Sequence, residues 1–215
     1  MMNQNKFSWA LFSRVPVIGI IRNMAMEDLF QVMQIFEIAG LTTIEITMNT
    51  PGAEEMIRYG VEKYGTDLNI GAGTVCTKKD LEKAIAAGAQ FIVTPVVRKK
   101  LIKACVEQDI PIFPGAMTPT EIYKAWKAGA SMVKVFPAKA LGAGYIKDVK
   151  APLHDIKLAP TGGIDLDNVE SFKDAGADAF GIGSPLFKKD LIAAKDWGAL
   201  QEHFKKIVDK LSIVA

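Results

Sequence analysis

Short apolar runs alternate with amphipathic stretches along almost the whole chain. The runs are rich in Val, Ile, Phe and Thr, which predicts strands. The stretches between them place apolar residues at helical spacing. We expect strands at residues 15–21, 43–48, 68–73, 91–94, 110–114, 132–136, 156–160 and 179–183. We expect helices at 26–39, 52–64, 77–87, 98–108, 118–128, 143–150, 166–175 and 196–211, and an extra helix at 5–13 before the first strand.

The dipeptide Ala-Gly recurs where four of the predicted helices end. Glycine adopts the left-handed conformation that closes a helix without a Cβ penalty, and a β-rich run follows each pair. The four pairs are Ala39-Gly40, Ala87-Gly88, Ala128-Gly129 and Ala175-Gly176.

Eight strands alternating with eight helices predict a (β/α)8 TIM barrel with an extra N-terminal helix. Near-continuous apolar strands are typical of a parallel sheet that is covered on both faces. No Pro- or Ser-rich linker divides the chain, so we expect residues 1–215 to form a single domain. A doubly wound open sheet is the alternative, but eight strands are many for this length and the dinucleotide-binding glycine fingerprint is absent.

The carboxyl ends of barrel strands carry the chemistry of this fold, and two charged residues interrupt the predicted strands there. Lys134 interrupts Met132-Val133-Lys134-Val135-Phe136, and Glu45 interrupts Ile44-Glu45-Ile46-Thr47. Strand alternation places both in the barrel if their apolar neighbours face the helices. Burial disfavours the ammonium form of a lysine and yields a nucleophilic amine that forms Schiff bases with carbonyl substrates. A snorkelling lysine, and a buried ion pair without chemistry, are the structural alternatives.

Two glycine-containing segments follow the last two predicted strands. In this fold the loops after strands seven and eight form the usual phosphate site, because glycines expose backbone N–H groups. The pattern predicts a phosphorylated or otherwise anionic substrate, although each segment alone is equally a tight turn. The segments are Thr161-Gly162-Gly163-Ile164 and Gly181-Ile182-Gly183-Ser184.

Composition narrows the remaining possibilities. The 215 residues have a net charge of +2 and contain only two His and two Cys. A disulfide framework and a His- or Cys-rich metal site are therefore not expected. The sequence contains no cluster of Lys and Arg residues of the kind that nucleic-acid binding requires.

No apolar run is long enough to span a bilayer. The first residues lack the charged, apolar and small-residue regions that make up a signal peptide. Two free cysteines fit a reducing compartment. We therefore expect a cytoplasmic protein.

The strand-end motifs resemble those of the class I 2-keto-3-deoxy-6-phosphogluconate (KDPG) and 4-hydroxy-2-oxoglutarate (KHG) aldolases. The resemblance extends from Val15 to Phe187 and is most specific in the last two motifs. The matching segments are Ile44-Glu45-Ile46-Thr47, Gly71-Ala72-Gly73-Thr74-Val75, Lys134-Val135-Phe136-Pro137-Ala138 and Pro160-Thr161-Gly162-Gly163-Ile164.

The resemblance implies a Schiff base on Lys134 and proton transfer by Glu45. It also implies a keto-acid sugar phosphate as substrate, a homotrimer, and no metal or other cofactor. The residues it assigns to the substrate are Thr74 and Thr161 for the keto acid, Phe136 and Pro95 for the pocket walls, and Gly162, Gly163 and Ser184 for the phosphate.

Two positions depart from the phosphogluconate-type pattern. Asn49 stands where an Arg that contacts the pyruvate portion is usual, and Thr94-Pro95 replaces a Ser-Pro pair. Both changes resemble the 2-keto-3-deoxy-6-phosphogalactonate (KDPGal) aldolases, which carry an Arg after strand one, as Arg22 does here. Our hypothesis is that Arg22 supplies the carboxylate-binding charge that Asn49 cannot.

We therefore predict an aldolase that splits KDPG into pyruvate and glyceraldehyde 3-phosphate, with 4-hydroxy-2-oxoglutarate as a further candidate substrate. KDPGal cleavage is the alternative within the same mechanism. A metal-dependent aldolase and a phosphate-binding barrel without chemistry are the rival classes.

Overall fold

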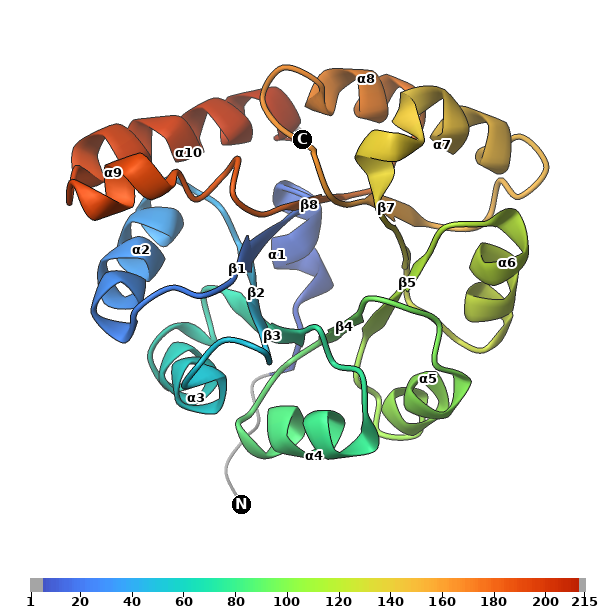
Figure 1. The fold of residues 1–215 in the computed structure, drawn as a ribbon, viewed down its shortest axis with the longest axis horizontal. Helices are drawn as coiled ribbons and strands as arrows, with labels where there is room; N and C mark the ends of the chain where they lie inside the picture. The colour runs from blue at the N-terminus through green and yellow to red at the C-terminus, as the bar shows by residue number, and fades with distance from the viewer. Residues whose placement is uncertain (1–5, 213–215) are drawn as a thin grey trace.

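The computed structural model describes residues 6–212, which form a ring of eight parallel strands surrounded by helices (Figure 1). The strands are β1 Val17–Ile21, β2 Thr43–Thr47, β3 Asn69–Gly73, β4 Ile92–Thr94, β5 Ile112–Ala116, β6 Val133–Val135, β7 Leu158–Pro160 and β8 Phe180–Ile182. The helices are α1 Trp9–Arg14, α2 Met26–Ile38, α3 Ala53–Tyr64, α4 Lys78–Ala86, α5 Lys99–Val106, α6 Pro119–Lys127, the 3₁₀ helix η1 Ala138–Ala140, α7 Gly142–Lys150, α8 Val169–Asp174, α9 Lys189–Ala193 and α10 Trp197–Leu211.

The sheet closes into a nearly complete barrel. Its strand order is β7-β6-β5-β4-β3-β2-β1-β8, and all of the strand pairs are parallel. A parallel bridge between Thr161 and Gly181 connects the two terminal strands of this order. The predicted (β/α)8 barrel is confirmed, and the open doubly wound sheet is not what forms.

Strand alternation separates two apolar layers. Val133 and Val135 belong to the layer that packs strands against helices, together with Ile44 and Ile46 on β2. A second, smaller cluster fills the barrel interior. Its members are Phe7, Phe12, Ile18, Phe91, Val93, Phe113, Met132, Ala159 and Ala179. The residues between the outward positions, including Glu45 and Lys134, therefore point into the barrel.

The segment before β1 closes the amino-terminal end of this barrel. Phe7 and Phe12 join the interior cluster, where each contacts the ring of Phe113. Asn69 on β3 accepts a 2.7 Å hydrogen bond from the Ser8 backbone N–H and donates to the Ser8 carbonyl. The extra helix predicted at 5–13 is present as α1, which begins only at Trp9, and residue 5 lies outside the described residues. The barrel can open only at its opposite end.

Several boundaries differ from the predicted pattern. Strand β5 lies two residues later than expected, because Gly115 and Ala116 pair with Lys134 and Val135. Helix α8 starts only at Val169, because the Asp165 side chain accepts two backbone N–H bonds and forms a turn instead. The short elements η1 and α9 were not predicted.

Within residues 6–212, no helix is both long and apolar enough to cross a membrane.

Candidate active site

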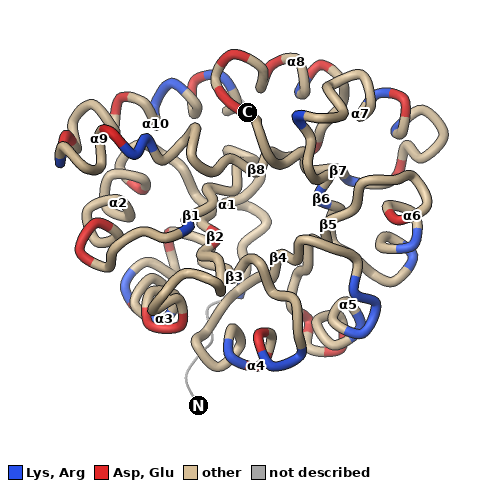
Figure 2. Tube along the Cα trace, viewed as in Figure 1, with Lys and Arg blue, Asp and Glu red and all other residues tan. Residues whose placement is uncertain are grey.

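Lys134 and Glu45 lie inside the barrel on β6 and β2. Glu45 exposes 1% of its surface and Lys134 exposes 8%. Figure 2 shows most charged positions on the surrounding helices, whereas β2 and β6 carry these two charges within the ring of strands. The Lys134 Nζ atom lies 5.2 Å from the centre of the Phe136 ring. The snorkelling alternative for Lys134 is therefore wrong, because this lysine is buried in the barrel.

The Glu45 carboxyl occupies an environment that disfavours its charge. Desolvation by burial raises its pKa above the usual 4.5, and the nearby charges of Lys134 and Arg22 offset only part of this effect. Its Oε1 atom is buried without a hydrogen-bond partner. Leaving a buried acceptor without a hydrogen bond costs free energy of folding. The Glu45 Oε1 atom can therefore accept a proton or a hydrogen bond from a bound molecule.

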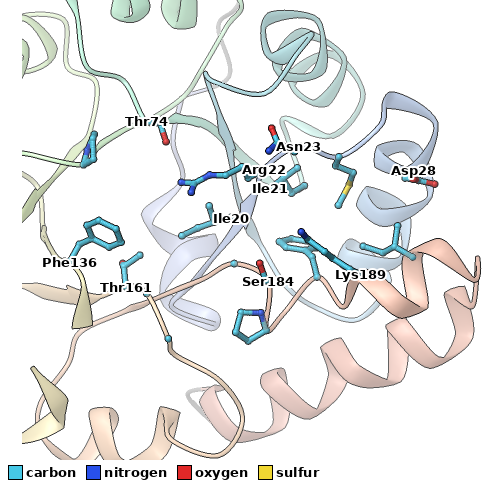
Figure 3. Close-up of a pocket in the computed structure, with 18 of the residues that line it drawn as sticks. Ile20, Ile21, Arg22, Asn23, Asp28, Thr74, Phe136, Thr161, Ser184 and Lys189 are labelled. Carbon is cyan, nitrogen blue, oxygen red and sulfur yellow. The ribbon is translucent and has the colours of Figure 1, made fainter. Parts of the chain in front are cut away.

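A cavity of about 510 Å³ opens at the carboxyl ends of the strands (Figure 3). Arg22 after β1 and Thr74 after β3 line one part of it, and Phe136 and Thr161 line another. In Figure 3 the Arg22 side chain extends from the end of β1 into this space. A volume of this size suits a small organic molecule.

Most of the predicted site residues meet in this cavity. Lys134 lines the cavity from its position on β6, whereas the buried Glu45 does not line the cavity. Asn49 is exposed and lies outside the lining set. The predicted residues that line the cavity are Arg22, Thr74, Pro95, Lys134, Phe136, Thr161, Gly162, Gly163, Gly183 and Ser184.

The described residues offer no obvious metal site. Residues 6–212 contain no group of three or more His, Cys, Asp and Glu side chains placed to hold a metal ion. The charged groups that surround the cavity are instead Arg22, Lys134, Lys189 and Asp28. Cationic groups outnumber the single carboxylate there, so the lining favours an anionic molecule.

Comparison with family models identifies the relatives of this barrel. Residues 10–203 match the model described as "Aldolase: KDPG and KHG aldolase". The chain belongs to the KDPG/KHG aldolase family. It is 34% identical over 177 residues to 2-dehydro-3-deoxy-6-phosphogalactonate aldolase of Escherichia coli K12, a match that covers 82% of this chain and 86% of the relative. It is 35% identical over 199 residues to 2-dehydro-3-deoxy-phosphogluconate aldolase of Treponema pallidum, with 91% and 94% covered.

A solved aldolase structure is also similar. The KDPG aldolase of Legionella pneumophila, described with pyruvate captured at low pH as a covalent carbinolamine intermediate, is 27% identical with a TM-score of 0.82. The match covers 95% of this chain and 97% of that one. The relatives of this chain therefore include aldolases named for both the gluconate and the galactonate substrate.

Glycines on the inner face of this barrel provide the room that its polar side chains occupy. A Cβ atom on Gly73 would lie 1.7 Å from the Glu45 Oε1 atom, and one on Gly181 would lie 2.3 Å from the Thr161 Oγ1 atom. In the sequence, the motif around Gly73 is informative only through its resemblance to the family. Glu45 pairs with Gly71 across β2 and β3, but its side chain extends to the next inward position of β3, which is Gly73.

Sequence reasoning missed the wall of the cavity that α9 and α2 contribute. Lys189 and Ile192 lie on α9, and Asp28 lies on α2, where it forms an ion pair with Lys195. Helix α9 spans only Lys189–Ala193, which is too short for a periodic signal. The charged run Lys-Lys-Asp that starts at residue 188 is the sequence signal that could have placed a charged group here.

We expect Gly73→Ala to destabilise the protein by about 1–3 kcal/mol, because the added methyl group overpacks the Glu45 site. Thermal or denaturant unfolding measures the effect. Gly144→Ala on α7 is the control, since nothing lies within 4 Å of its Cβ position. Equal stability of the two variants would contradict the steric role of Gly73.

Glu45→Gln tests the raised pKa of Glu45. The folded protein binds the Glu45 proton more tightly than the unfolded chain does. The stability contributed by Glu45 is therefore present below pH 4.5 and is lost as pH rises through the folded pKa. We expect the variant to have a higher Tm than the wild type at neutral pH, with the difference closing below pH 4.5.

Glu121→Gln is the control of opposite sign. Backbone N–H bonds from Met117 and Thr118 hold the pKa of the Glu121 carboxyl below 4.5, so this substitution lowers Tm at neutral pH. A Glu45→Gln variant that is less stable than the wild type at neutral pH, and recovers in acid, would overturn the assignment for Glu45.

Proposed function

We propose that this chain is a class I, metal-independent aldolase that cleaves KDPG to pyruvate and glyceraldehyde 3-phosphate. One observation carries the proposal. Two buried ionisable groups, Lys134 and Glu45, both point into the barrel at a cavity whose charged lining is mostly cationic. A purely binding barrel needs neither a buried amine nor a buried carboxyl with an unpaired oxygen.

The reaction begins at Lys134. Its neutral amine attacks the C2 carbonyl carbon of the substrate and forms a carbinolamine, which loses water to give an iminium. The solved Legionella relative supports this step, because pyruvate was captured in it as a covalent carbinolamine. The iminium then accepts the electron pair released when the C3–C4 bond breaks.

Glu45 supplies the proton transfer that accompanies bond cleavage. As the C3–C4 bond breaks, the carboxylate takes the proton of the C4 hydroxyl, either directly or through a water molecule, and glyceraldehyde 3-phosphate leaves. The remaining enamine is protonated at C3, and water hydrolyses the iminium to release pyruvate from Lys134. The raised pKa of Glu45 supports this role, because burial makes the carboxylate a stronger base, and the proton that it takes up is then available to be returned.

The two ends of the cavity fit the two ends of this substrate. Arg22 binds the carboxylate next to the C2 carbonyl, while Thr74 and Thr161 hold the keto acid and Phe136 and Pro95 form the walls. Backbone N–H groups bind the phosphate at the opposite end, where Gly162 and Gly163 adopt φ angles of 90° and 78° that favour glycine. Gly183, Ser184 and Lys189 complete this end.

KDPGal is the second candidate substrate, and one observation favours it. Asn49 is exposed and does not line the cavity, whereas Arg22 does. This is the arrangement that the resemblance to KDPGal aldolases implies. Cleavage of 4-hydroxy-2-oxoglutarate and a homotrimeric assembly are further parts of the proposal that rest on the family alone. A cytoplasmic location is a further part that rests on the sequence, including its two free cysteines.

Lys134→Met and Lys134→Arg test the Schiff base. Neither side chain can form an iminium, so we expect turnover to fall by about a thousandfold or more. Lys103→Met is the matched control, because Lys103 is 77% exposed on α5 and pairs only with Glu107 in the next turn. Pyruvate release measures both, and turnover retained in either Lys134 variant would refute the mechanism.

Pyruvate release from KDPG and from KDPGal, measured separately with the wild-type protein, tests the substrate. Our proposal predicts the higher kcat/KM for KDPG. A higher value for KDPGal would replace the first candidate by the second, and cleavage of neither would remove both.

A further inference from the structure

The backbone just after β1 has an unusual conformation next to Arg22. Asn23, the next residue, has a φ of 53°, in the left-handed region that non-glycine residues seldom adopt. Asn tolerates this region better than most residues. The direction in which Arg22 leaves β1 depends on this turn, because the two residues share a peptide unit.

No ion pair or side-chain hydrogen bond within residues 6–212 fixes the Arg22 side chain. Within residues 6–212 its guanidinium has no ion pair within 4 Å, although its charge is close enough to lower the pKa of Glu45. Arg22 is exposed at the rim and extends into the cavity (Figure 3). The backbone at Arg22 and Asn23 sets the point from which this side chain enters the cavity.

A buried threonine holds that backbone. The Asn23 N–H donates a 3.0 Å hydrogen bond to the Thr50 hydroxyl, and Thr50 exposes only 3% of its surface. The Thr50 and Thr47 hydroxyl oxygens lie 3.0 Å apart, and the Thr50 N–H donates to the Thr47 carbonyl. Thr50 is thus fixed to the end of β2, the strand that carries Glu45.

We propose that Thr50 is a positioning residue that holds Arg22 in place for the substrate carboxylate. Thr50 does not line the cavity, so it acts through the Asn23 backbone. Pairing of β1 with β2 aligns Ile20 with Glu45, so the same two strands set both Arg22 and the base. This inference rests on the proposed function.

The test measures kcat and KM for the better of the two phosphorylated substrates. Thr50→Val keeps the shape of the side chain but removes the acceptor for the Asn23 N–H. We expect KM to rise about five- to tenfold, the effect of one lost hydrogen bond, while kcat stays within about twofold. Thr50→Ser keeps the hydroxyl and restores KM.

Two comparisons separate positioning from a merely structural effect. Thr42→Val is the matched control, because Thr42 is 4% exposed and its hydroxyl donates to the Leu11 carbonyl at the closed end of the barrel. It lowers stability but leaves KM unchanged. In an Arg22→Ala background, Thr50→Val causes no further rise in KM, since its effect passes through Arg22.

Several outcomes overturn the inference. These are an unchanged KM in Thr50→Val, an equal rise in Thr42→Val, or full additivity with Arg22→Ala. A wild-type protein that cleaves neither substrate would instead remove the proposed function, and the role of Arg22 with it. A wild type that cleaves substrate while Thr50→Val behaves normally overturns the positioning role alone.

Discussion

Burial of one carboxyl group inside a closed barrel is the constraint on which the rest of the site depends. Glu45 is almost completely removed from solvent, and the desolvation of its charge outweighs the attraction of Lys134 and Arg22. A buried ionisable group of this kind costs stability, so stability does not explain its presence, and such groups cluster at functional sites. The arrangement therefore indicates a function, and the family membership of the chain names its class.

The barrel makes this burial possible by combining a closed end with an open one. Aromatic side chains and α1 fill the amino-terminal part of the interior, so the cavity that Lys134 lines lies at the carboxyl ends of the strands. Glycine on β3 leaves the space that the Glu45 carboxyl occupies. Packing and chemistry thus occupy successive layers along the same eight strands.

The sequence predicted the parts of this structure that follow from periodicity. Apolar runs located all eight strands, and a charge in the middle of such a run identified Lys134 and Glu45 as inward-facing. Alternation is a local property of a strand, so it needs no knowledge of distant contacts.

The features that sequence reasoning missed depend on contacts between distant segments. Helix α9 is too short to show a period, and its contribution of Lys189 to the cavity depends on how the chain returns after β8. Asn49 occupies a position at which the family pattern has a substrate-binding residue, but the structure places Asn49 on the exposed surface. The hydrogen bond from Asn23 to Thr50 joins residues 27 positions apart, and no sequence-spacing rule predicts it.

Borohydride reduction in the presence of pyruvate, followed by mass mapping, tests the central claim most directly. The claim is that the buried amine of Lys134 forms an iminium with a keto acid. The account predicts a stable reduced pyruvate adduct on Lys134 in the wild-type protein. An unmodified protein, or an adduct confined to another lysine, would contradict it.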